Sequence, residues 1–393
     1  MSSNCLKKLL CLAAIVFVAS GLALGSNALA AAPQQTSQEF VSVNNVDALA
    51  RSFAGMNIGK VSGDVIIGQG PNYRGMVSAS WNSYQQKLGV PMSRWASKEV
   101  AFPGGGTVFY PFSGPDFATV GQLFPGAERY VLVAIQAARQ PPDPTKMNPV
   151  NRQAMYGHFA TEWKSFGRLG FFRTNDLEAD VRNQASGVGV SPILMAFAAR
   201  LGYRVLELAP IAYNEAKKDY DWAELPENTP WQSVRLVLSR DGRMSFLDYV
   251  QMDLSDTFLG SHDAERQWLE RMAKNPVLLK AASHLPQRPQ FTVIRDAILA
   301  NAPLVVQDET GIEYKDLVNI GDIALYGRFV KPYKLFDRGS QQSLAVAYKS
   351  AKQAGSLPFS FSYLKAADQR SVQIARRKPV NVTGEPKPDG KKG

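Results

Sequence analysis

Residues 107–135, TVFYPFSGPDFATVGQLFPGAERYVLVAI, carry the clearest indication of the fold. Thr107–Tyr110 is a short strand candidate that ends at Pro111, and Tyr130–Ile135 is an almost wholly apolar run, as is typical of a buried strand. Between them, residues 115–123 predict a helix, because proline is favoured in a first turn and an acid there complements the helix dipole. Strand, loop, helix and strand in so short a span predict a βαβ-like unit.

The segments after this unit also alternate between helix and strand patterns. Residues 151–166 predict an amphipathic helix, and residues 231–252 predict a β-hairpin that turns at Asp241-Gly242. We further expect a helix over 276–284 and strands over 304–306 and 323–329. The hairpin argues against a purely parallel sheet. The prediction is therefore an α/β or α+β fold, with a mixed β-sheet and flanking helices, Rossmann-like in part.

A proline-rich stretch divides the chain. Residues 140–149 contain Gln140-Pro141-Pro142-Asp143-Pro144, which interrupts regular structure. We interpret this stretch as the connection between an N-terminal α/β part, residues 46–139, and a main α/β part, residues 150–365.

The N-terminus has the pattern of a cleavable secretion signal. Residues 1–30 contain Lys7 and Lys8, then an apolar run, then Ala28-Leu29-Ala30 as a cleavage site, and residues 31–45 are a polar linker. No later segment is long and apolar enough to cross a bilayer, so we expect a soluble periplasmic or extracellular protein, not an integral membrane protein.

Cysteine usage limits the chemistry. The chain has two cysteines, Cys5 and Cys11, and both lie in the predicted signal peptide. A mature chain without them excludes disulfides, thiolate catalysis and cysteine-ligated metal sites, and it suits an oxidising compartment.

Much of the positive charge lies at the C-terminus. The formal net charge is +10, and from Arg376 onward six Lys and Arg residues oppose only two acids. We expect residues 366–393 to form a disordered basic tail that either is simply solvated or binds an anionic envelope surface. Nucleic acid is not an expected partner, because basic and aromatic residues are not interleaved.

Two stretches carry a resemblance. FYPFSGPDF (Phe109–Phe117) and VQDETGIEYKDL (Val306–Leu317) resemble sequences of a family of exported bacterial proteins, from which no activity transfers. The loop from Ser113 to Asp116 is also similar to the nucleotide-binding edge of Rossmann-like methyltransferases. It lacks their run of glycines and is no GxGxxG motif, so no cofactor is expected.

Candidate residues for chemistry are few. His158 and Glu162 lie four residues apart on the predicted helix over 151–166, with Glu162 inside its apolar stripe. They are either a buried acid–base pair, or two metal ligands, or a structural hydrogen bond. The sequence shows no third residue that would complete a metal site with His158 and Glu162, so we expect no metal site.

Carboxylates at the ends of strands are the other candidates. Asp253 follows the hairpin and Asp308 follows an apolar strand, and both positions suit acid–base sites or ordinary turns. Ser113 and Asp116 are candidates for ligand binding in the first loop.

Two functions follow from these observations. The first is a non-catalytic protein of the cell envelope that binds a ligand or partner, and the alternative is an envelope hydrolase that uses carboxylates and a histidine. An enzyme should gather His158, Glu162 and a remote carboxylate in one cleft, whereas a binding protein should show a largely apolar pocket with few ionisable groups.

Overall fold

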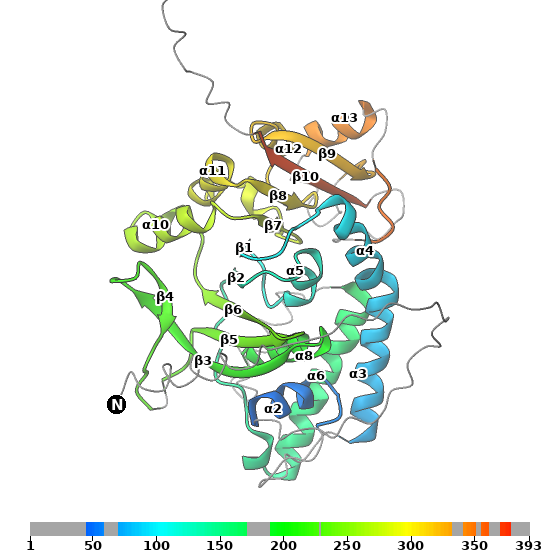
Figure 1. Ribbon diagram of the computed structural model, residues 1–393, viewed down its shortest axis with the longest axis vertical. Helices are drawn as coiled ribbons and strands as arrows, with labels where there is room; N and C mark the ends of the chain where they lie inside the picture. Colours follow the sequence, from blue (N-terminus) through cyan, green and yellow to red (C-terminus); the bar gives the residue numbers. More distant parts are fainter. Residues whose placement is uncertain are drawn as a thin grey trace, which may run out of the picture. The chain divides into compact units, whose positions relative to one another are not determined.

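A single ten-stranded sheet organises the computed structural model, which describes residues 45–58, 70–170, 189–227, 229–331, 341–350, 355–360 and 370–378 (Figure 1). The strands are β1 (Thr107–Pro111), β2 (Arg129–Ala134), β3 (Arg204–Asn214), β4 (Asp219–Trp222), β5 (Ser233–Arg240), β6 (Arg243–Gln251), β7 (Val277–Leu279), β8 (Leu304–Gln307), β9 (Gly321–Gly327) and β10 (Ser371–Arg377). Their order across the sheet is β4-β3-β5-β6-β2-β1-β7-β8-β10-β9.

The helices connect and cover these strands. They are α2 (Asn45–Phe53), α3 (Pro71–Tyr84), α4 (Val90–Glu99), α5 (Phe117–Leu123), α6 (Pro149–Leu169), α8 (Ser191–Arg200), α9 (Asp256–Leu259), α10 (Asp263–Met272), α11 (Thr292–Asn301), α12 (Tyr314–Leu317) and α13 (Gln342–Ser350). The mixed α/β fold expected from the sequence is confirmed.

Five adjacent strands, β6-β2-β1-β7-β8, are parallel. Numbered by their order in the chain, they run third, second, first, fourth, fifth, which is the strand order of the doubly wound Rossmann fold. The order reverses between β1 and β7. In open α/β sheets, ligands bind outside the carboxyl ends of the strands at such a switch point. Antiparallel strands extend the sheet at both edges.

The predicted βαβ unit lies at the centre of the sheet. β1 pairs with β2 in parallel, and α5 connects them. Asp116 caps α5, because its Oδ1 accepts a hydrogen bond from the Thr119 backbone N–H at 3.1 Å.

Side-chain alternation along the strands produces two apolar cores, one on each face of the sheet. In β1, Val108 and Tyr110 belong to the core beneath α2 to α8, whereas Phe109 belongs to the core beneath α9 to α12. The predicted apolar stripe of α6 is confirmed, with its four members all buried: Met155, Phe159, Trp163 and Phe166. Figure 1 shows α6 running alongside α3, where this stripe packs.

The hairpin and two of the predicted strands are also found. β5 and β6 pair as the hairpin, and both turn residues, Asp241 and Gly242, have positive φ, as tight hairpin turns require. Strands β8 and β9 correspond to the predicted strands over 304–306 and 323–329.

The helix predicted over 276–284 is wrong. Residues 277–279 are β7, three buried apolar residues between β1 and β8. A central parallel strand is covered on both faces, so it has no alternation to distinguish it from a short buried helix. Positive φ at Ala281 then ends regular structure.

The boundaries of the predicted parts also differ. Strands from both sides of residues 140–149 share one sheet, and the described residues belong to one compact unit, so this stretch does not separate two domains. Residues 371–377 form β10, hydrogen-bonded between β8 and β9, so the predicted tail cannot begin at 366. The predicted signal peptide, the linker up to residue 44 and residues 379–393 lie outside the described residues.

None of the helices in the described part of the chain combines the length and the apolar character that a membrane span requires.

Candidate ligand-binding site

A cavity opens where four parallel strands end. It has a volume of about 150 Å³ and is lined by residues that follow β1, β2, β6 and β7. Phe112, Gln136, Met252, Ala282 and Phe291 contribute to its wall. The cavity therefore lies at the carboxyl edge of the sheet, beside the switch point between β1 and β7.

The backbone around this cavity is unusual. Phe112, Ala281 and Ser283 line the cavity with φ of 59°, 51° and 52°, and His284 follows with 58°. Each non-glycine residue in this region costs about 1–3 kcal/mol, and such residues cluster at functional sites, where the surroundings hold them in place.

The segment after β8 holds the strained loop. The Asp308 carboxylate accepts a hydrogen bond from the Ala281 N–H at 2.7 Å, and the Thr310 hydroxyl accepts one from the Ala282 N–H at 2.7 Å. Asp308 is fully buried and also accepts from the Thr310 backbone N–H at 2.8 Å. The sequence candidate Asp308 thus positions the cavity wall and does not line the cavity.

Gln136 supplies the buried polar group of the cavity. Only 9% of this residue is exposed, and its buried Oε1 has no hydrogen-bond partner among the described residues. A buried polar atom without a partner costs about 1–3 kcal/mol, so a ligand whose binding lets the Gln136 side chain turn Oε1 toward a donor would recover this energy.

Asp253 is the one candidate of the sequence analysis that lines the cavity. It is exposed, and its Oδ1 accepts a hydrogen bond from the Ser255 N–H at 2.8 Å, before α9. No other ionisable side chain is among the residues that line the cavity in the described part of the chain.

On the other face of the sheet, the buried ion pair of Lys280 and Asp116 occupies the start of α5, where Rossmann folds bind phosphate. Lys280, fully buried, donates to Asp116 Oδ2 at 2.7 Å, to the Thr119 hydroxyl at 2.9 Å and to the Gly170 carbonyl at 3.1 Å. A phosphate at the start of α5 would meet the carboxylate of Asp116. Asp116 is therefore a capping and pairing residue, and a pyrophosphate does not fit there.

Ser113 has a similar local role. Its backbone N–H and its hydroxyl both donate to the Val133 carbonyl, at 3.1 and 3.3 Å. These bonds tie the loop after β1 to the end of β2, so Ser113 shapes the cavity mouth without lining it.

The candidates His158 and Glu162 lie away from the cavity. His158 is exposed on α6, so the buried acid–base pair with Glu162 does not form. Gly170, at the end of this helix, contacts Lys280, and His158 lies twelve residues earlier, about 18 Å along the axis. Neither His158 nor Glu162 lines the cavity.

His284, the last residue of the helix predicted over 276–284, lies next to the cavity-lining residues Ser283 and Leu285. It is buried, and its Nδ1 lies 3.0 Å from Gln287 Oε1. Burial lowers its pKa below the usual value, and the hydrogen bond to Gln287 opposes this shift only in part.

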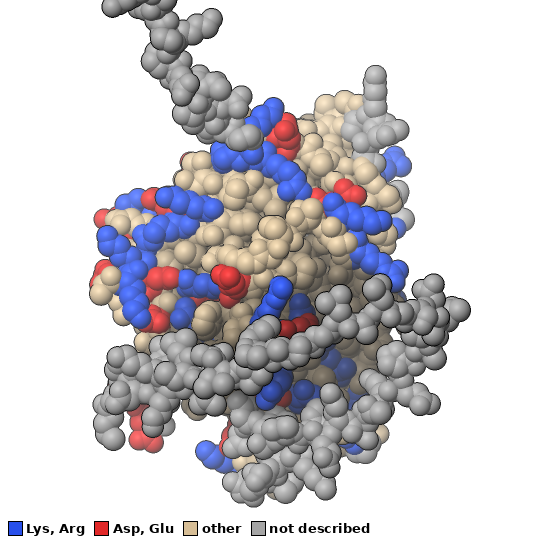
Figure 2. Space-filling model, in the orientation of Figure 1, with Lys and Arg blue, Asp and Glu red and all other residues tan. Residues whose placement is uncertain are grey.

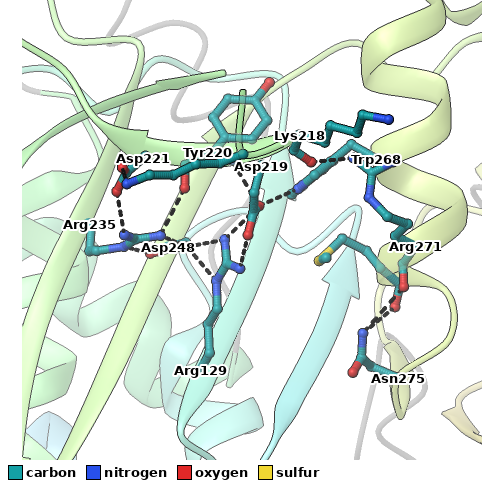
Figure 3. A network of polar contacts seen from close by, with 12 residues as sticks. Arg129, Lys218, Asp219, Tyr220, Asp221, Arg235, Asp248, Trp268, Arg271 and Asn275 are labelled. Carbon is teal, nitrogen blue, oxygen red and sulfur yellow. Dashed lines mark hydrogen bonds and ion pairs between the residues drawn. The ribbon is translucent and has the colours of Figure 1, made fainter. Parts of the chain in front are cut away.

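A second buried ionic network lies beside β2 and the hairpin (Figure 3). Asp248, fully buried, accepts from Arg129 Nε at 2.7 Å and from Arg235 Nε at 2.6 Å, and Arg129 also donates to Asp219 at 3.0 Å. Burial alone would raise the pKa of Asp219, but hydrogen bonds from Arg129 and Trp268 hold it below its usual value. These charges satisfy one another, so we assign the network to joining β2, β4, β5, β6 and α10.

A wider hollow of about 730 Å³ lies between α10 and α11. Its wall carries charges of both signs, and Figure 2 shows Lys and Arg beside Asp and Glu over this region. Arg266 already pairs with Asp263 and with Glu270, both at 2.9 Å. This is the pattern of a solvated surface with weak ion pairs.

Comparisons of the chain with protein-family models, with curated proteins and with solved structures found no match. We therefore base the function on the geometry of the chain itself.

Sequence reasoning missed most of the site. Gln136, Phe112, Phe291 and Lys280 were not candidates. One signal was present: a polar residue directly after a buried apolar strand, as Gln136 is after Tyr130–Ile135, lies at the carboxyl edge of a sheet if that sheet is parallel. The sheet order needed to use this signal is not visible in any local stretch.

Proposed function

We propose that this chain is an exported, non-catalytic protein of the cell envelope that binds a small ligand in the cavity at the carboxyl ends of β1, β2, β6 and β7. The observation that carries the proposal is the unpartnered Oε1 of Gln136, buried in the wall of an otherwise largely apolar cavity. Its place beside the switch point of the sheet supports the same interpretation.

The hydrolase alternative has less support. Of the six candidate residues only Asp253 lines the cavity, and the exposed His158 belongs to a distant helix. Acid–base catalysis needs its groups within hydrogen-bond reach of one substrate. The arrangement of the described residues instead favours ligand binding without a reaction.

The compartment and the tail remain part of the proposal. Export rests on the signal pattern of residues 1–30, and binding of an anionic envelope surface rests on the basic residues from Arg376 onward. Replacing Lys387, Lys391 and Lys392 with glutamine removes three positive charges and keeps the two acids, so it should weaken binding to vesicles that contain phosphatidylglycerol at low salt, while binding that is unchanged would remove this role.

Blocking the cavity mouth tests the binding proposal. Ile135 lines the cavity and is 56% exposed, so Ile135→Trp should fill the mouth without disturbing either core. Val346→Trp on α13 is a matched control, because Val346 is 53% exposed and does not line the cavity.

The readout is the backbone amide spectrum during titration with benzyl alcohol, a neutral probe of suitable size. We expect saturable shifts at Gln136 and Ala282 in the wild type and in Val346→Trp, and none in Ile135→Trp. Equal shifts in all three proteins would remove the cavity as a binding site, and so would the absence of a saturable shift both with benzyl alcohol and with charged and apolar probes of the same shape.

A further inference from the structure

We propose that the cavity selects small organic ammonium compounds with an apolar body. This inference rests on the proposed binding function and specifies the class of ligand. Three features of the cavity wall carry it: its charge, its hydrogen-bonding groups and its size.

The charge of the wall is negative. Asp253 is the ionisable residue in the described lining, and no lysine or arginine lines the cavity there. Lys280 follows β7, but its ammonium group points into the opposite core, where Asp116, Thr119 and Gly170 accept its hydrogen bonds. An anionic ligand would therefore find no counter-charge, whereas a cation would find the carboxylate of Asp253.

Two hydrogen-bond acceptors belong to lining residues of the cavity. Gln136 Oε1 is buried without a partner in the described part of the chain, and the Asp253 carboxylate lies at the exposed side of the wall. The backbone N–H groups of Ala281 and Ala282, which would otherwise be donors after β7, already donate to Asp308 and Thr310. An ammonium ligand brings donors for both of these acceptors, Gln136 Oε1 and the Asp253 carboxylate.

The size of the cavity limits the apolar body. A cavity of about 150 Å³ accepts a molecule with the size of benzene. Phe112 and Phe291 line it as an edge-to-face pair with their ring centroids 5.6 Å apart. Aromatic faces also attract cations, so these rings favour an ammonium ligand over an isosteric neutral one.

Four probes of one shape separate these contributions: benzylamine, benzyl alcohol, toluene and benzoate. Amide titrations of the purified protein at pH 7, where benzylamine is protonated, give a dissociation constant for each. We expect benzylamine to bind about fivefold more tightly than benzyl alcohol, which is the effect of one exposed charge pair. Toluene should bind more weakly than benzyl alcohol, and benzoate weakest of all.

Asp253→Asn tests the charge directly. In this variant benzylamine should lose its fivefold advantage, while the affinity for benzyl alcohol stays the same. Asp263→Asn is the control, because Asp263 is also exposed but lies on α10, outside the cavity. This control should keep the full preference for benzylamine.

The outcomes separate the two proposals. If benzoate or toluene binds as tightly as benzylamine, or if Asp253→Asn keeps the preference, the ligand class is wrong although the cavity still binds. If none of the four probes shifts the amides of the cavity, the binding function fails, and the ligand class fails with it.

Discussion

The buried pair between Lys280 and Asp116 allows a quantitative test of the fold around the switch point. The lysine is fully buried, the Asp116 side chain is 8% exposed, and the Nζ–Oδ2 distance is 2.7 Å. At an effective dielectric constant of about 20, two charges at this distance attract by about 6 kcal/mol. Lys280→Met removes this attraction and leaves a buried carboxylate, which costs about 3–5 kcal/mol of unfolding free energy.

The double variant makes this prediction refutable. Lys280→Met with Asp116→Asn removes both charges, and replacing both partners is often close to neutral, so the double variant should be more stable than either single variant. Urea unfolding at pH 7, followed by tryptophan fluorescence, measures all four proteins. A cost below about 1 kcal/mol for Lys280→Met, or single costs that add in the double variant, would refute the pairing.

Three further predictions concern other parts of the molecule. Asp248→Asn leaves two arginines beside a neutral amide in the core, so the free energy of unfolding in urea should fall by about 3–5 kcal/mol. Asp241→Asn is the control: the Asp241 side chain is 90% exposed and lies 3.8 Å from Arg240, so this change should have little effect. Burial lowers the pKa of His284, so below about pH 6.5 the unfolded state binds a proton that the folded state does not. The melting temperature should therefore fall as the pH is lowered below about 6.5, and His284→Asn should make this dependence on pH less steep. Gly189→Ala would place a Cβ onto a backbone carbonyl oxygen of the loop after β2 and should cost about 1–3 kcal/mol, while Gly157→Ala, with open space in a helix, should stabilise by about 0.5–1 kcal/mol in the same urea assay.

The parts of the fold that were predicted correctly are those with a local signal. The α6 stripe repeats at helical spacing, and the hairpin alternates on both sides of Asp241-Gly242, so short stretches suffice to identify them. β7 has no such signal: its three residues are all apolar and buried, and a short apolar run of this kind is equally typical of a buried helix. β10 was missed because its basic neighbours dominate the composition, although Val372 and Ile374 face one core.

The candidate site could be predicted only in part, for a different reason. Asp253 was recognised as a carboxylate after a strand, and it does line the cavity. Gln136 and Phe291 come from segments more than 150 residues apart, and only the strand order brings them to the same wall. His158 was a candidate because it lies four residues before Glu162 on one helix. This spacing makes the two residues neighbours on the helix surface, but it does not show whether another element covers that surface.

A crystal structure of the protein purified from the exported fraction of its host, without removal of bound molecules, would show whether the cavity holds a ligand. We expect density for a small molecule in the cavity, against Phe112 and Phe291, with a donor atom about 3 Å from Gln136 Oε1. A cavity that holds only water, or that closes so that Gln136 bonds to the chain itself, would contradict the proposed ligand binding.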